Sequence, residues 1–151
     1  MDLAELQSLA RQKAAAYALD PALVCAVAEQ ESGWDPAAIR FEKNWAFRLM
    51  ADDTIIGQHI FPPSRDTEIA QRSFSWGVMQ VLGQTAREQG CTYPYLTRLC
   101  EPEIGLEFGC KVLMMKLKKA QGDVRLGLHY YNGGGDVTYP AAVMGRMAKY
   151  R

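Results

Sequence analysis

The feature that constrains this chain most is an apolar segment, residues 22–28, that runs directly into a charged end at residues 29–32. Asp20 and Pro21 precede it in the order typical of a helix N-cap and a first helical residue. Gly33 follows it, where a helix commonly ends. Because a helix that is apolar on all sides is normally buried, we expect this one to lie in the core. Its charged last turn must then emerge from apolar surroundings.

Glu29 and Glu31 both lie in that last turn. Two residues along a helix correspond to about 200°, so the two side chains point to nearly opposite sides and only one can face a cleft. Partial burial disfavours the charged form of a carboxyl group and raises its pKa toward the range of a general acid at neutral pH. In this segment alone, a solvated glutamate in the last turn of a helix is the simpler interpretation of Glu31.

Helical periodicity continues over most of the chain. Helices are predicted over residues 3–18, about 85–89, about 103–120, 124–131 and about 139–149. Residues 34–74 are the least regular region, which we interpret as an extended excursion with room for a short helix or hairpin. The chain contains no internal repeat and no low-complexity linker. The sequence therefore predicts one all-α domain over residues 1–151 with an irregular insertion at about 34–74.

Charge and hydropathy exclude several classes of protein. The chain has 151 residues with 17 basic and 17 acidic side chains, so its formal net charge is zero. Nucleic-acid-binding domains usually carry a basic excess, and we expect no nucleic-acid partner. No stretch approaches the ~20 apolar residues that cross a bilayer, so we expect no stable membrane insertion. Residues 1–5 read Met-Asp-Leu-Ala-Glu, unlike a secretory signal, and we expect a protein made without a signal peptide.

Four cysteines, at positions 25, 91, 100 and 110, include no Cys-x-x-Cys pair, and only His59 and His129 could add nitrogen ligands. This spacing does not match the usual zinc sites, so no metal is expected. Cys25 and Cys110 lie within apolar helical patterns and are predicted to be buried thiols. Cys91 and Cys100 could close a small loop, but the sequence cannot choose among the alternative pairings.

Residues 75–80 read Ser-Trp-Gly-Val-Met-Gln and offer groups suited to binding a sugar. Gly77 allows backbone to approach a ligand closely, because it has no side chain. Gln80 has donors and acceptors that match sugar hydroxyl or acetamide groups. Val78 and Met79 would more often belong to a core, so this segment alone is a weak signal.

Residues 130–134 read Tyr-Tyr-Asn-Gly-Gly at the end of a predicted helix. Tyr130 and Tyr131 can present an aromatic face to a sugar, and Asn132 can present an amide. A helix that simply ends at glycine explains the same residues. Each signal is modest when taken by itself.

Taken in order, these segments resemble the soluble lytic transglycosylase family, which shares its lysozyme-like fold with the goose-type lysozymes. The family signature is a buried helix ending in Glu-Ser, then Gly-Leu-Met-Gln, then Tyr-Asn-Ala-Gly. This chain has Glu31-Ser32, Gly-Val-Met-Gln at 77–80 and Tyr-Asn-Gly-Gly at 131–134. The segment from Pro102 is similar to the helix start that the family places between its second and third motifs. The resemblance covers about residues 20–135, with mild departures at positions 78 and 133.

The resemblance implies an enzyme that cleaves the β-1,4 bond between N-acetylmuramic acid (MurNAc) and N-acetylglucosamine (GlcNAc) in the glycan strands of peptidoglycan. It implies 1,6-anhydroMurNAc products and no cofactor. Carried over position by position, it makes Glu31 the catalytic acid and base and places Gln80, Tyr131 and Asn132 in the sugar cleft. The full set of expected substrate-binding residues is Ser32, Glu42, Ser75, Gly77, Met79, Gln80, Tyr130, Tyr131 and Asn132.

Glu31 and Ser75 are 44 positions apart, farther than in the compact members of that family. Arg40-Phe41-Glu42, a variable stretch and then Ser-Trp-Gly resemble versions of the family in phages and prophages. That lineage implies an enzyme that acts on the wall in the periplasm, delivered by a phage particle or by a holin-like partner during lysis. We expect it to act as a monomer.

Two alternatives stay open. One of the acidic residues in the longer segment could hold a water molecule opposite Glu31, which would make the protein an inverting muramidase of the goose-lysozyme kind. The candidates for this second carboxylate are Glu42, Asp52, Asp53, Asp66 and Glu68. The other alternative is a catalytically inert wall-binding module or virion structural protein that retains the fold.

Overall fold

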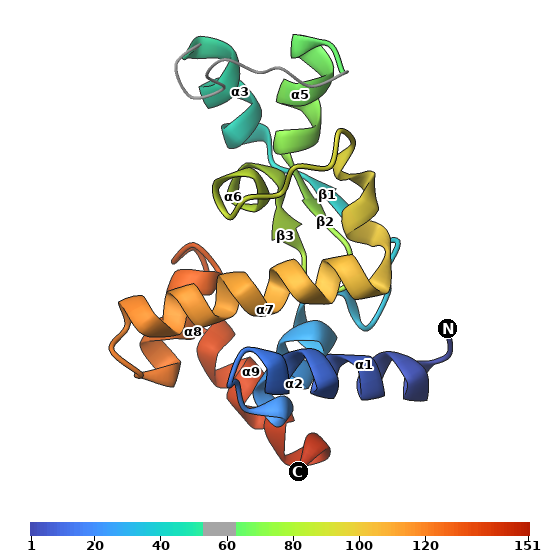
Figure 1. Ribbon diagram of the computed structural model, residues 1–151. Helices are drawn as coiled ribbons and strands as arrows, with labels where there is room; N and C mark the ends of the chain where they lie inside the picture. Colours follow the sequence, from blue (N-terminus) through green and yellow to red (C-terminus); the bar gives the residue numbers. More distant parts are fainter. Residues whose placement is uncertain (53–62) are drawn as a thin grey trace.

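The computed structural model describes residues 1–52 and 63–151, and these are mostly helical, as predicted. The long helix α7 (Pro102–Lys119) crosses the middle of the molecule (Figure 1). Below it in that view lie α1 (Leu3–Ala16), α2 (Pro21–Ser32), α8 (Val124–Tyr131) and α9 (Tyr139–Arg146). Above it lie α3 (Lys43–Ala51), α5 (Arg65–Arg72), α6 (Gly83–Glu88) and a small sheet. Two short 3-10 helices, η1 (Leu96–Cys100) and η2 (Met147–Tyr150), complete the described elements.

Helix α2 lies in the core, as the sequence predicts, and residues 22–28 are all buried. The Asp20 side chain accepts a hydrogen bond from the Ala22 amide at 2.8 Å, and Pro21 occupies the first helical position. Gly33 ends the helix in the left-handed conformation, with a φ of 62°. Helices α1 and α9 and the 3-10 helix η2 pack around it. The helix therefore delivers its last turn, with Glu31, from the centre of the core to a half-buried position.

The sheet has three short antiparallel strands in the order β1-β2-β3. They are β1 (Ile39–Phe41), β2 (Phe74–Trp76) and β3 (Val81–Leu82). In the register of β1 and β2, Arg40 lies opposite Ser75. In the register of β2 and β3, Ser75 lies opposite Leu82. Strands this short are defined by their pairing rather than by a local pattern, which is why the sequence analysis did not predict the sheet.

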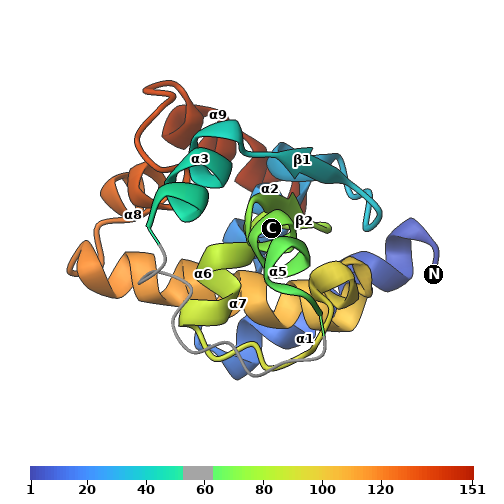
Figure 2. The same ribbon diagram turned by 90° about the horizontal axis from the view of Figure 1, so that it is seen from above.

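Residues 34–74, predicted as an extended excursion with room for a short helix or hairpin, contain more regular structure than expected at both ends. Strand β1 and helix α3 occupy residues 39–51 except for Glu42, and helix α5 with strand β2 occupies most of 65–76. Pairing of β1 with β2 brings the two ends of the excursion together, and α3 and α5 extend from this point side by side (Figures 1 and 2). Leu49 and Ile69 form a small buried contact between these helices, separate from the main core.

All four cysteines are free thiols. Cys25 and Cys110 are buried, as predicted, and Cys91 and Cys100 do not close a loop. The predicted helix over 139–149 ends earlier, because its last turn tightens into η2, as helix C-termini often do. Among the described residues, none of the helices has the length and apolarity that a membrane span requires. His59 and Asp53 lie outside the described residues.

Candidate active site

Seven of the predicted site residues line one cleft, which has a cavity volume of about 250 Å³. They come from the end of α2, the junction of β1 and α3, strand β2, the turn after it, and the end of α8. These seven are Glu31, Glu42, Ser75, Gln80, Tyr130, Tyr131 and Asn132. The cleft is completed by Arg40, Trp45, Val81, Leu82, Thr85, Val112, Lys116 and Gly133. The residues predicted from three separate motifs are therefore neighbours in space.

Glu31 is the carboxyl group that combines a place in the cleft with a raised pKa. Burial is the main cause of the raised pKa, and the nearby carboxylate of Glu42 adds to it. A hydrogen bond of 2.5 Å, which the Tyr139 hydroxyl donates to Glu31 Oε1, and the charge of Arg40 act in the opposite direction. The result is a carboxyl group that holds its proton to a higher pH than an ordinary glutamate, while an oriented donor supports its charged form.

Glu29 points away from the cleft, as helical geometry predicts. Its carboxylate accepts hydrogen bonds from Lys149 Nζ at 2.6 Å and from the Tyr150 hydroxyl at 2.7 Å. The hydrogen bond from Lys149 is the main cause of the lowered pKa of Glu29, and the hydrogen bond from Tyr150 adds to it. A carboxylate with a lowered pKa that forms an ion pair on the opposite side of the helix is unsuited to act as the acid of this cleft.

The turn formed by residues 77–80 is held from three sides. The Ser32 hydroxyl, at the end of α2, donates to the Val78 carbonyl at 2.8 Å. The Tyr131 hydroxyl, at the end of α8, donates to the Met79 carbonyl at 2.8 Å. Gln80 Nε2 donates to the carbonyls of Ala38 and Gly77, each at 2.9 Å. Both amide hydrogens of Gln80 are thereby used, and its carbonyl oxygen is the group left for a ligand.

Ser32, Gly77 and Met79 were predicted to bind substrate, but none of them lines the cleft. Gly77 has a φ of 71°, and a Cβ at this position would lie 2.2 Å from the Leu99 carbonyl oxygen. The Met79 side chain is fully buried, so the prediction that it contacts substrate needs correction. It packs against Gly109, where a Cβ would lie 2.3 Å from the Met79 sulfur. These three residues shape the turn that carries Gln80.

Glu42 is the one described member of the proposed second carboxylates that lines the cleft. Its Oε1 accepts hydrogen bonds from Arg40 Nε and from the Ser75 hydroxyl, both at 2.8 Å. The register of β1 and β2, which sets Arg40 opposite Ser75, places both donors beside it.

The remaining acidic candidates lie elsewhere. Asp52 ends helix α3, and Asp66 lines a separate apolar pocket between α3 and α5. Glu68 is fully buried and forms ion pairs with Arg72 and Arg87 at 2.5 and 2.7 Å, so the suggestion that it holds a catalytic water is wrong.

The chain matches the transglycosylase SLT domain over residues 8–138, which include every residue that lines the cleft. It belongs to this family. SLT domains have a lysozyme-like fold and act on peptidoglycan as lytic transglycosylases, so the predicted family and fold are confirmed. No curated protein and no solved structure matches the chain.

Sequence analysis of this SLT domain missed Tyr139, which lies just beyond the matched segment and is buried against Glu31. Its only local signal is its place before Pro140 at the start of α9, which identifies a helix start and no chemistry. Trp45, Thr85 and Lys116 were also missed, because each lies in a helical segment with no local pattern that indicates a binding site. Within residues 1–52 and 63–151 there is no group of three or more His, Cys, Asp and Glu side chains that could hold a metal ion.

Proposed function

We propose that this SLT domain cleaves the β-1,4 bond between MurNAc and GlcNAc in peptidoglycan, with Glu31 as general acid and then general base. The observation that carries the proposal is the position of Glu31: a half-buried carboxyl group with a raised pKa, in a cleft lined by residues of all three motifs. A general acid must hold its proton near the working pH, and burial shifts the pKa of Glu31 in that direction.

In the first step Glu31 donates its proton to the oxygen that links MurNAc C1 to GlcNAc, and the C1–O bond breaks. The acetamide oxygen of the same MurNAc bonds to C1 and carries the positive charge that develops. In the second step the Glu31 carboxylate takes the proton of the C6 hydroxyl while that oxygen attacks C1 and displaces the acetamide. The product is a 1,6-anhydroMurNAc end, no water is consumed, and Glu31 is protonated again.

Tyr139 suits this double role. Its hydroxyl donates to Glu31 Oε1, so it stabilises the carboxylate that remains after the first proton transfer. It also fixes one oxygen of the carboxyl group, which leaves the other to face the glycosidic bond. Glu31 and residues of all three motifs reach the cleft within a single chain, which supports the proposal that the domain acts as a monomer.

A hydrolytic reaction of the inverting kind is the second candidate, because Glu42 lines the same cleft as Glu31. In that reaction Glu42 would activate a water molecule on the opposite face of the sugar. Arg40 and Ser75 already bind one oxygen of Glu42, which favours a role in shaping the cleft. The transglycosylase reaction needs no second carboxylate and is therefore the proposal we prefer.

Digestion of purified peptidoglycan, followed by mass spectrometry of the soluble products, tests the proposal. Products lighter than hydrolytic ones by one water are expected from the native protein, and also from Glu42→Gln. Glu31→Gln should reduce the rate by about 10²–10⁴, the usual effect of removing a general acid or base. Ordinary reducing ends, lost in Glu42→Gln, would instead establish the hydrolase. Binding to sacculi without soluble products from the native protein would support an inert wall-binding or virion module.

The cell wall is the proposed place of action. The resemblance of Arg40-Phe41-Glu42 and Ser-Trp-Gly to phage and prophage versions of the family supports delivery by a virion or by a holin-like partner.

A further inference from the structure

Lys116 is a cation in the cleft that no neighbouring group neutralises. It lies on α7, lines the cleft and is half-buried. Across the described part of the chain its ammonium group has neither a hydrogen bond nor an ion pair. Removing part of the hydration of a charge is unfavourable unless a partner compensates for it. An unpaired and partly desolvated ammonium group in a binding cleft therefore indicates a ligand that brings the opposite charge.

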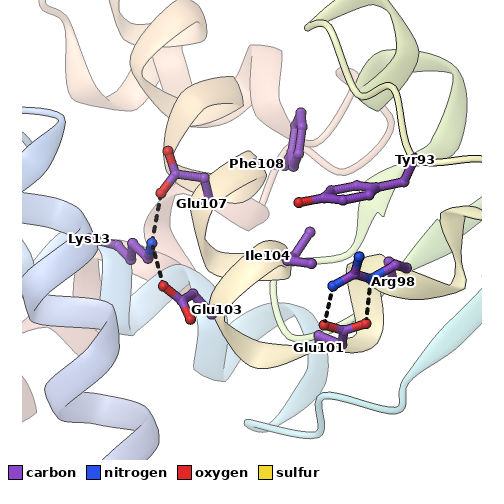
Figure 3. A pocket seen from close by; sticks show the side chains of 8 residues that line it. All are labelled: Lys13, Tyr93, Arg98, Glu101, Glu103, Ile104, Glu107 and Phe108. Atoms are coloured by element: carbon purple, nitrogen blue, oxygen red, sulfur yellow. Dashed lines mark hydrogen bonds and ion pairs between the residues drawn. The ribbon is translucent and has the colours of Figure 1, made fainter.

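The other cation of the cleft and the cations of the pocket at the start of α7 are paired with carboxylates within the chain. In the cleft itself, Arg40 forms an ion pair with Glu42 at 2.8 Å. In the pocket at the start of α7, Lys13 contacts Glu107 at 2.8 Å and Glu103 at 3.5 Å (Figure 3).

The same pocket holds Arg98 and Glu101, which share two hydrogen bonds at 2.6 and 2.9 Å (Figure 3). That pocket therefore presents no unpaired cation to a ligand. Lys116 differs from all of these groups.

The surroundings of Lys116 strengthen this difference. Burial lowers its pKa, and the charge of Lys119 lowers it further, while Glu88 acts in the opposite direction. The Glu88 carboxylate is engaged by Gln84 Nε2 at 2.9 Å. Lys119 lies over the ring of Tyr130, a lining residue, at 4.6 Å from its centroid. Two cations therefore border this part of the cleft, and an anion bound there would interact favourably with both.

We propose that Lys116 binds a carboxylate of the peptidoglycan strand and so determines which strands the cleft accepts. This inference rests on the proposed function. GlcNAc is neutral, but MurNAc carries a free carboxylate on its lactyl group where no peptide is attached. Where a stem peptide is attached, the lactyl group is an amide and the carboxylates belong to the peptide. The shared chemistry is a carboxylate bound by an ammonium group, which is among the stronger hydrogen-bonded pairs.

The test measures binding rather than turnover, in a Glu31→Gln background that leaves the ligand intact. Three ligands of equal length are compared: strands with stem peptides, strands stripped of peptides by an amidase, and chitin oligosaccharides, which have no carboxylate. Lys116→Gln removes the charge, and Lys118→Gln is the matched control, since Lys118 is exposed on the same helix and does not line the cleft.

We expect Lys116→Gln to weaken binding of a carboxylate-bearing strand by about tenfold or more, the equivalent of one charged hydrogen bond. Binding of chitin oligosaccharides should be unchanged, and Lys118→Gln should have no effect on any ligand. A loss confined to strands with peptides identifies the stem carboxylates as the target, and a loss on stripped strands identifies the lactyl carboxylate.

Equal losses on all three ligands, or no loss on any, would overturn the role of Lys116. Failure of the proposed function would be seen differently: the native protein would release no fragments from peptidoglycan, and the background variant would bind none of the ligands.

Discussion

Tyr139 donates a hydrogen bond to Glu31 across 108 positions of sequence, and it does so from the buried start of helix α9. The hydrogen bond lowers the pKa of Glu31, while burial raises it by a larger amount. The protonation state of the proposed catalytic acid therefore depends on a helix that lies outside the sequence motifs.

Removal of this hydroxyl should change the pH dependence of the reaction. In Tyr139→Phe the pKa of Glu31 loses the influence that lowers it, so the carboxyl group keeps its proton to a higher pH. The decline of kcat/KM at alkaline pH should move upward, as measured by release of soluble muropeptides across a pH series. Tyr150→Phe is the control, because it removes a hydroxyl bonded to Glu29 on the other side of α2. An identical shift in both variants would assign the effect to general loosening of the fold.

Glu31→Gln should make the protein more stable at neutral pH. Because burial raises the pKa of Glu31 above its ordinary value of 4.5, the native state binds more protons than the unfolded chain above that pH, and stability falls as pH rises. Glutamine cannot ionise and escapes this penalty, which amounts to about 1.4 kcal/mol for each unit of pKa shift. Urea denaturation should show a gain at neutral pH that disappears below pH 4.5.

Glu29→Gln is the matched comparison for that measurement and should behave in the opposite way. Hydrogen bonds from Lys149 and Tyr150 lower the pKa of Glu29, so its carboxylate contributes stability above its ordinary pKa that is lost as the pH falls. Loss of stability in both variants at neutral pH would contradict the assignment of Glu31 as the desolvated carboxyl group.

Gly77→Ala should destabilise the turn that carries Gln80. The added Cβ would lie 2.2 Å from the Leu99 carbonyl oxygen, and the residue also has a left-handed φ of 71°. Strain of this kind costs about 1–3 kcal/mol, and the backbone collision adds to it. Gly133 has a similar φ of 74°, but a Cβ added there would meet no atom within 4 Å. Comparing the thermal unfolding of Gly77→Ala and Gly133→Ala therefore separates the cost of the left-handed backbone from the cost of the collision. Equal changes in Tm would show that the close approach to Leu99 has no energetic effect.

Glu68→Gln should destabilise the protein strongly, although Glu68 does not line the cleft. Burial alone would raise the pKa of Glu68, but hydrogen bonds from Arg87, Arg72 and Gln71 outweigh it and lower the pKa. Breaking a buried ion pair from one side typically costs about 3–5 kcal/mol. Glu103→Gln, at an exposed ion pair, should cost less than about 1 kcal/mol in the same denaturation experiment. Similar small losses in both would mean that the buried network contributes little.

The local sequence pattern was sufficient to predict an element whose start, buried face and end are all encoded in its own residues. Asp20, the apolar run 22–28 and Gly33 predicted helix α2, and the helical repeat predicted that Glu29 and Glu31 face opposite sides. Helix geometry depends on neighbours three and four positions apart, so it is visible in a short stretch of sequence. The order of the motifs also indicated the family that the comparison confirms.

What only the tertiary structure decided is which distant groups meet. The strand register that sets Arg40 opposite Ser75, the contact of Tyr139 with Glu31, and the entry of Glu42 rather than Glu68 into the cleft have no local pattern. Met79 shows the same limit of the sequence analysis: it belongs to a motif that was expected to bind substrate, but its side chain is buried in the core. Sequence determines the periodicity of each segment, but proximity between segments follows from packing and strand pairing, which depend on the whole fold.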